Sequence, residues 1–83
     1  MIKYSAIIVF PTGEESPIII SGESHNHCYE KIRQYDIICS GMIEGYLNEK
    51  YVFLDRYDAK YEAMKCNQIK FMSDSRALYD GDI

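Results

Sequence analysis

Both histidines of this chain lie in the stretch Ser21 to Cys28, "SGESHNHC", beside a glycine and a cysteine. Such residue types occur in metal centres, around nucleophilic cysteines, in acid–base sites and in phosphate-binding loops. The spacing decides among these four kinds of site, because each chemistry needs its groups in a particular arrangement.

The metal reading requires four ligands for a structural zinc ion. On a helix His25 and Cys28 share a face, whereas His27 points elsewhere. The other two cysteines, Cys39 and Cys66, lack the spacing of a zinc finger. Polar residues at a helix start and a buried thiol therefore explain the stretch better, and we expect no metal and no cofactor.

A cysteine nucleophile is the second reading. His25 and a helix start would lower the pKa of the Cys28 thiol and so activate it. Cys28, however, lies on the expected apolar stripe of the same helix. A buried structural thiol is therefore the favoured reading.

The phosphate-binding reading is the strongest of the chemical readings, although the residues alone favour a structural role. After a strand, Gly22 permits close approach, Ser24 caps the helix, and His25 can donate to a phosphate. A second expected helix also begins after a strand, with Arg56 at its first position and Tyr57 beside it. A guanidinium suits bidentate phosphate contact, and a tyrosine ring can stack on a nucleobase. If both helix starts lie at one end of the sheet, these groups converge on one ligand.

A structural reading stands beside this one. Arg56 would pair with Asp55 or Asp58 at the surface, and His25 would be a solvated residue of the cap. Gln68 follows the second helix at its far end, where a glutamine usually bonds to backbone. In a homo-oligomer a neighbouring copy would bring Gln68 to the ligand, so we include it in the candidate ligand-binding set: Gly22, Ser24, His25, Arg56, Tyr57 and Gln68.

The elements that must position these residues follow from periodicity. Residues 2–21 predict a β-hairpin around "PTGEES", and residues 42–55 predict a second hairpin with "NEK" at its tip. Residues 23–41 predict a helix that stops at Ser40 and Gly41, and residues 55–67 predict a helix capped by Asp55. This ββαββα order predicts an α+β two-layer sandwich, in which an antiparallel sheet carries two helices on one face.

Composition limits the class of protein. The 83 residues predict one domain over 1–72 and a C-terminal tail over 73–83, with Leu78 and Tyr79 able to dock on a partner. The net charge of −4 and the scattered lysines and arginines disfavour a nucleic acid polymer as partner. The longest apolar run is too short to cross a membrane, and three cysteines without a CxxC pair favour a cytoplasmic location.

One segment resembles a family of small tailed-bacteriophage proteins. The family pattern is glycine, aromatic, leucine, a polar turn, Phe-Val-Asp-Arg, alanine and Gly-Gln-Ile. The matching positions here are Gly45, Tyr46, Leu47, Phe53, Leu54, Asp55, Arg56, Ala59, Ala63, Gln68 and Ile69. A Gly-x-x-His-x-x-Cys segment also matches at Gly22, His25 and Cys28, so the resemblance covers about residues 20–83. Three positions depart from the pattern: Ser24 and Tyr51 replace arginines, and Asn67 replaces a glycine.

The resemblance implies a role in the host bacterial cytoplasm, where some small phage proteins counter defences that signal through nucleotides. We expect a homo-oligomer that binds and sequesters a small phosphate-bearing nucleotide. One alternative is an enzyme that cleaves a cyclic nucleotide without metal, with His25 as the acid–base group. Another is an inhibitor that acts by contact with a host protein.

Overall fold

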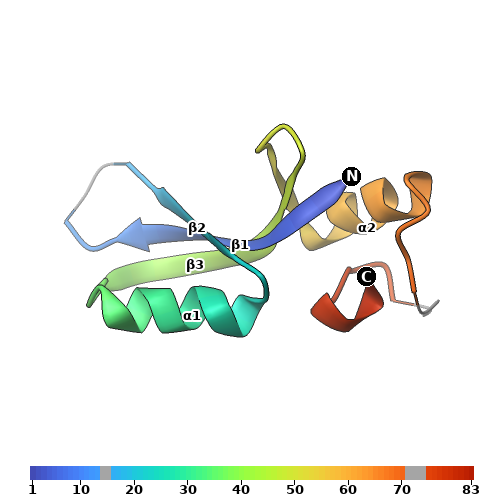
Figure 1. The fold of residues 1–83 in the computed structure, drawn as a ribbon. Coiled ribbons are helices and arrows are strands. Elements are labelled where there is room, and N and C mark those ends of the chain that lie inside the picture. Colours follow the sequence, from blue (N-terminus) through green and yellow to red (C-terminus); the bar gives the residue numbers. More distant parts are fainter. Residues whose placement is uncertain (14–15, 71–74) are drawn as a thin grey trace.

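The computed structural model describes residues 1–13, 16–70 and 75–83. Within these ranges, four strands form one sheet, two helices of ten residues each pack on it, and a short 3-10 helix lies near the C-terminus (Figure 1). In chain order the elements are β1 (Ile2–Pro11), β2 (Ile18–Gly22), α1 (His25–Gln34), β3 (Cys39–Asn48), β4 (Phe53–Asp55), α2 (Arg56–Lys65) and η1 (Asp80–Asp82).

The sheet is antiparallel, with the strand order β2-β1-β3-β4. Ser5 pairs with Gly22 of β2 and with Tyr46 of β3, so these three residues share one face of the sheet. Ile7, two residues along β1, lies on the same face. α1 packs on Ile7 and α2 packs on Tyr46, so both helices cover one face. The predicted α+β sandwich is confirmed.

The first helix ends earlier than the sequence predicts. α1 stops at Gln34, and the stretch predicted as its last turn begins strand β3 at Cys39. Asp36 takes a left-handed conformation with φ 51°, and the Ile37 N–H bonds to the Ile32 carbonyl at 3.1 Å. This is a Schellman ending, which an aspartate supports without glycine because its short side chain tolerates positive φ.

The second half of the fold follows the prediction closely. Asp55 caps α2 by accepting from the backbone N–H of Tyr57 and of Asp58, at 3.0 and 2.8 Å. α2 also ends in a Schellman motif, with Asn67 at φ 58° and the Gln68 N–H bonded to the Ala63 carbonyl at 2.8 Å. Asparagine suits this helix end because its short polar side chain tolerates a positive φ.

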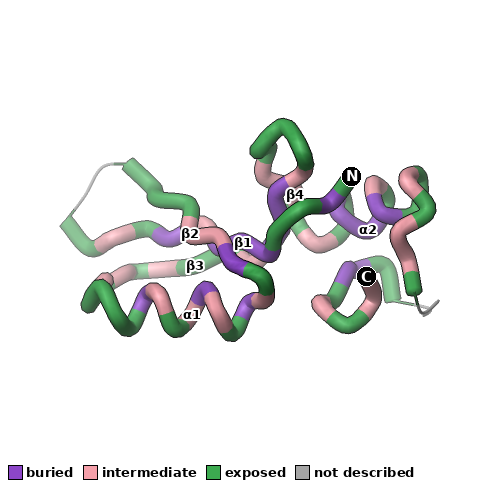
Figure 2. The backbone as a smooth tube through the Cα atoms, viewed as in Figure 1, coloured by how far each residue is buried: buried purple, intermediate pink, exposed green. Residues whose placement is uncertain are grey.

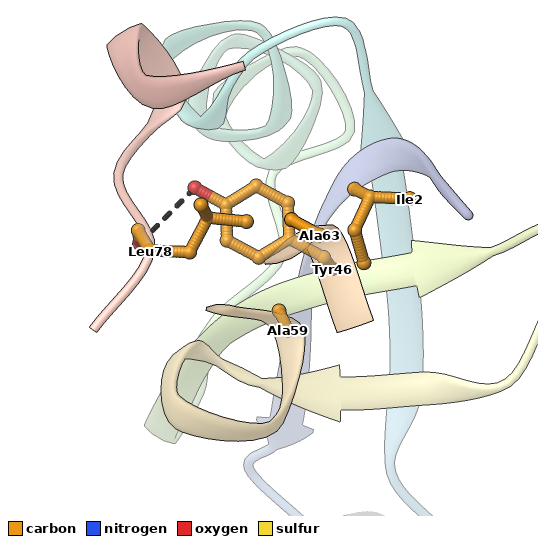
Figure 3. Close-up of a cluster of buried hydrophobic side chains, with 5 residues drawn as sticks. All are labelled: Ile2, Tyr46, Ala59, Ala63 and Leu78. Atoms are coloured by element: carbon orange, nitrogen blue, oxygen red, sulfur yellow. Dashed lines mark hydrogen bonds between the residues drawn. The ribbon is translucent and has the colours of Figure 1, made fainter. Parts of the chain in front are cut away.

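Two buried clusters lie side by side along the sheet (Figure 2). One joins β1 to α1, and its members are Ile7, Val9, Cys28 and Ile32. The other joins β1, β3, α2 and the C-terminal segment, and its members are Ile2, Tyr46, Ala59, Ala63 and Leu78 (Figure 3). The small side chains of Ala59 and Ala63 bring α2 close to the ring of Tyr46.

The C-terminal segment 75–83 is part of the fold. Leu78 is completely buried in the second cluster, and its backbone N–H donates to the Arg56 carbonyl at 2.9 Å. The structure thus accounts for Leu78 inside its own chain, whereas Tyr79 is half exposed. The predicted tail began at residue 73, and positions 73 and 74 lie outside the described residues.

Candidate functional site

The carboxylate of Asp80 is the centre of a polar network at the start of α1. It accepts from the Ser5 hydroxyl at 2.9 Å, from the Tyr46 hydroxyl at 2.9 Å and from the backbone N–H of His25 at 2.8 Å. The His25 ring contacts it too, with Nδ1 2.8 Å from Oδ1. An internal anion therefore lies where the sequence predicted a phosphate.

His25 is held on both sides of its ring. Nδ1 faces Asp80, and Nε2 lies 2.8 Å from the carbonyl oxygen of Gly45. Each ring nitrogen therefore lies within hydrogen-bond distance of an oxygen atom of the chain. The residue is 6% exposed, and its ring meets the Tyr46 ring edge-on at 5.0 Å. The solvated role considered for His25 is therefore wrong: it is a buried partner of Asp80.

This environment shifts two titrating groups in opposite directions. Burial by itself would raise the pKa of Asp80, but the donors from His25, Ser5 and Tyr46 outweigh it and hold this pKa below its usual value. Burial, reinforced by the neighbouring carboxylate, raises the pKa of the Tyr46 phenol. Asp80 thus remains a carboxylate and Tyr46 a neutral donor near neutral pH.

Arg56 contacts the same C-terminal segment from the start of α2. Its Nη1 donates to the Leu78 carbonyl at 2.6 Å, and its Nη2 pairs with Glu44. The guanidinium also lies 4.9 Å from the centre of the Tyr79 ring. The predicted surface pairing of Arg56 with Asp55 or Asp58 is not what the structure has, because its partner Glu44 comes from β3.

Glu44 joins Arg56 to α1. Its second carboxylate oxygen accepts from the Tyr29 hydroxyl, and this hydrogen bond, with burial, raises the pKa of Tyr29 to about 12. Burial opposes the charge of Glu44, but the donors Tyr29 and Arg56 outweigh it and lower its pKa. Glu44 is therefore a charged link between the two helices.

The two helix starts do converge, as the phosphate-binding reading requires. His25 contacts residue 80 and Arg56 contacts residue 78 of the same segment. What they bind, however, is the chain itself, because Asp80, Glu44 and the Leu78 carbonyl occupy their donors. The ligand role of the two residues stays a prediction, and a ligand there would have to displace these groups.

The other predicted ligand residues have structural contacts of their own. Ser24 caps α1 by accepting from the His27 N–H at 3.1 Å. A Cβ at Gly22 would lie 2.9 Å from the His27 ring, so this glycine makes room for a side chain. Tyr57 is 63% exposed at the start of α2. Gln68 bonds to both the N–H and the carbonyl of Ile2, at 2.7 and 3.0 Å, which is the backbone contact considered from sequence.

A cavity of about 400 Å³ lies beside the network. β1 contributes its first residues, and the start of α1, the chain after α2 and the C-terminal segment contribute the rest. The lining residues are Ile2, Lys3, Tyr4, Ser5, Glu23, Gln68, Lys70, Asp80 and Ile83. Its volume falls within the range of small-molecule sites, about 300–1,000 Å³. Of the six predicted ligand residues, Gln68 borders it.

A second hollow of about 570 Å³ lies at the end of α1. Ile32, Ile37 and Ile38 line it, together with Arg33 and Asp36. Its two charged residues have opposite signs and follow each other closely in the chain. None of the predicted ligand residues borders this hollow, and we give it no role.

Neither thiol chemistry nor a metal centre gains support at the start of α1. Burial raises the pKa of Cys28, whose sulfur lies 3.5 Å from the Ser5 carbonyl oxygen. Over the described ranges, no group of three or more His, Cys, Asp or Glu side chains is arranged to hold a metal ion. Within the same ranges, no helix is long and apolar enough to cross a membrane.

Several residues of the site were missed from sequence. Asp80 carried a usable signal, because a helix start attracts an anion and the chain ends in an acidic stretch. Glu44 carried none, since its position on the helix-covered face appears only when the strand register is known. Lys3 and Lys70 are far apart in the sequence, and neither belongs to a cluster of basic residues. Only the tertiary structure brings them to one cavity.

The chain matched no family model, no curated protein and no solved structure.

Proposed function

We propose that this protein binds and sequesters a small phosphate-bearing molecule in the cavity between the start of β1 and the C-terminal segment. The observation that carries the proposal is the cavity itself, which has ligand size and contains two lysines, Lys3 and Lys70. Cationic side chains in a concave site attract an anion and can bond to phosphate oxygens. This cavity replaces the site first expected around His25 and Arg56.

The acidic residues of the cavity are consistent with such a ligand. Asp80 lines the wall, but its carboxylate already accepts hydrogen bonds from Ser5, Tyr46 and the backbone N–H of His25. Glu23 also lines the cavity and can accept from the amino group of a nucleobase. A molecule with an anionic end and a hydrogen-bond-donating end therefore suits the lining better than inorganic phosphate.

An aromatic residue favours a nucleotide over other phosphate esters. Tyr4 lines the cavity, and its ring stacks with that of Tyr51 at a centroid distance of 6.3 Å and an angle of 19°. Stacking of a base on an aromatic ring contributes about 1–3 kcal/mol. The resemblance to phage proteins makes nucleotide immune signals of the host cytoplasm the first ligands to test.

Sequestration has more support than cleavage. A general acid or base must exchange protons with the substrate, whereas both ring nitrogens of His25 are bound within the chain. His27 accepts from the Glu23 N–H at 3.3 Å, and it does not line the cavity. We therefore expect any bound nucleotide to be recovered intact.

The test is calorimetric titration with cyclic nucleotides and ADP-ribose derivatives, followed by denaturation and chromatography of the released ligand. We expect binding of at least one of these compounds, and at least about tenfold weaker binding by the variant Lys3→Ala/Lys70→Ala. Lys50→Ala is the matched control, because Lys50 is exposed in the turn between β3 and β4 and does not line the cavity. Absence of binding across the set, or equal losses in the control, would refute the proposal.

A further inference from the structure

Three charged side chains of the cavity at the start of β1 have no partner that would occupy them. In the part of the chain that the structure describes, no hydrogen bond or ion pair engages the ammonium groups of Lys3 and Lys70 or the carboxylate of Glu23. All three residues are exposed, and the contact of Glu23 with His27 uses the backbone N–H of Glu23. The groups available to a ligand are therefore two cations and one anion.

Other polar side chains of the lining already have partners within the chain. The Ser5 hydroxyl donates to the carboxylate of Asp80 at 2.9 Å. The Gln68 amide bonds to both the N–H and the carbonyl of Ile2. These groups shape the wall, so the choice of ligand depends mainly on the three unpaired charges.

An irregularity of β1 falls at one of the cations. Ile2 pairs with Asn48, and Tyr4 pairs with the next residue of β3, Leu47, so Lys3 is the extra residue of a β-bulge. A bulge interrupts the regular alternation of side chains and redirects the side chain of the extra residue. The bulge therefore gives Lys3 a direction that a regular strand would not, and Lys3 lines the cavity.

The anion and the second cation belong to different ends of the cavity. Glu23 comes directly after the β2 residue that pairs with Ser5. Lys70 comes two residues after the glutamine that bonds to the backbone of Ile2. Ile2 and Ser5 are three residues apart on β1, which corresponds to about 10 Å of extended chain. This separation is close to the length of a nucleotide from its 5′-phosphate to the far edge of its base.

A carboxylate at the base end distinguishes guanine from the other bases, because a carboxylate only accepts hydrogen bonds. Guanine presents two adjacent donors, N1–H and the N2 amino group, so one carboxylate can accept from both. Adenine and cytosine place an acceptor nitrogen beside the amino group, and uracil places a carbonyl oxygen on each side of its N–H. Each of these three bases would therefore turn an acceptor toward the carboxylate.

We propose that the ligand of this cavity is a guanine nucleotide and that Glu23 selects the base. The carboxylate of Glu23 accepts from N1–H and from the N2 amino group, and Lys3 and Lys70 contact the phosphate. This inference rests on the proposed function and adds the identity of the base to it.

The test is calorimetric titration of the full chain with cyclic GMP, cyclic AMP and cyclic IMP, which differ only in the base. Hypoxanthine, the base of cyclic IMP, keeps the N1–H of guanine and lacks the N2 amino group. We expect cyclic GMP to bind at least about tenfold more tightly than cyclic AMP, with cyclic IMP between them, because a bidentate contact discriminates between bases to this extent. Cyclic di-GMP and cyclic di-AMP repeat the comparison for ligands with two phosphates.

Glu23→Gln replaces one acceptor oxygen by a donor and keeps the shape of the side chain. It should weaken the binding of cyclic GMP by at least about tenfold and leave that of cyclic AMP within about twofold. Glu30→Gln is the matched control, because Glu30 is exposed on α1 and does not line the cavity. The variant Lys3→Ala/Lys70→Ala should weaken both nucleotides alike, because the phosphate is common to them.

The possible results separate this inference from the proposed function. Equal affinities for guanine and adenine nucleotides, or an unchanged preference in Glu23→Gln, would overturn the choice of guanine and leave the proposed function intact. Equal losses in Glu23→Gln and Glu30→Gln would overturn the role of Glu23. If none of these nucleotides and none of the ADP-ribose derivatives binds, the proposed function fails and the inference fails with it. Circular dichroism verifies that each variant keeps its fold.

Discussion

The two ends of the sheet are built on different principles. At the α1 end, Ile7, Val9, Cys28 and Ile32 form an apolar cluster between one helix and the strand beneath it. At the α2 end, the cluster around Tyr46 is complete only when Leu78 arrives from the C-terminal segment. Figure 3 shows the Tyr46 hydroxyl bonded to the Leu78 carbonyl, at 3.3 Å.

This difference indicates which contacts make the stability of the protein sensitive to mutation and to pH. Apolar contact is nondirectional and nearly independent of pH, so the cluster of Ile7, Val9, Cys28 and Ile32 depends mainly on shape and volume. The start of α1 differs from this cluster, because Asp80 holds it through hydrogen bonds with His25. The α2 end depends in addition on directed hydrogen bonds to Asp80 and from Arg56. Changes at residues 78–80 should therefore affect stability, and part of the acid sensitivity of the fold should come from Asp80.

The largest expected effect comes from Leu78→Ala. The side chain is completely buried, so its removal should lower the free energy of unfolding by about 2–5 kcal/mol, like a core residue of the sheet. Urea denaturation followed by circular dichroism measures this change. Met64→Ala is the control, since Met64 is 52% exposed on α2. A loss no larger than that of the control would mean that the C-terminal segment contributes little to the α2 end.

His25→Ala should have the next largest effect. It removes the ring that bridges Asp80 and the Gly45 carbonyl, and it leaves the carboxylate with fewer donors, so we expect a loss of about 1.5–3 kcal/mol. His27→Ala is a matched control from the same helix, whose ring accepts one long hydrogen bond. Equal midpoints of thermal unfolding in the two variants would contradict the buried role of His25.

The smallest expected effect is on how the free energy of unfolding varies with pH in the acid range. Because the pKa of Asp80 is lowered in the folded protein, the unfolded chain takes up this proton first as the pH falls. The stabilisation is complete above the pKa of an unfolded aspartate, about 3.9, and is lost as the pH falls through the folded-state pKa. In Asp80→Asn, which keeps the shape, stability should fall less steeply below about pH 4.

Denaturation midpoints measured at several pH values test this expectation. Glu44, whose pKa is also lowered, remains in both proteins, so some acid dependence persists in the variant. Parallel curves for the wild-type protein and for Asp80→Asn would show that the acid sensitivity comes from other carboxylates.

Much of the fold was predictable because its signals are local. Ser24 and Asp55 act as helix caps at the predicted positions, and Ala59 and Ala63 form the buried stripe of α2. The end of α1 was not predictable from glycine, because Asp36 takes the positive φ that ends the helix, well before Gly41. Periodicity also misplaced Cys39, which fits a helical stripe by spacing but begins a strand.

By itself the sequence determined the antiparallel α+β sandwich, the two capped helix starts and the preference of those helix starts for a nearby anion. These properties depend on residues that are near neighbours in the chain. Only the tertiary structure decided that Asp80 is the anion at the start of α1 and that Glu44 links Tyr29 to Arg56. It also decided that Lys3 and Lys70 line one cavity. Such pairings join residues far apart in sequence, and they depend on strand register and on where the C-terminal segment docks, which local pattern does not encode.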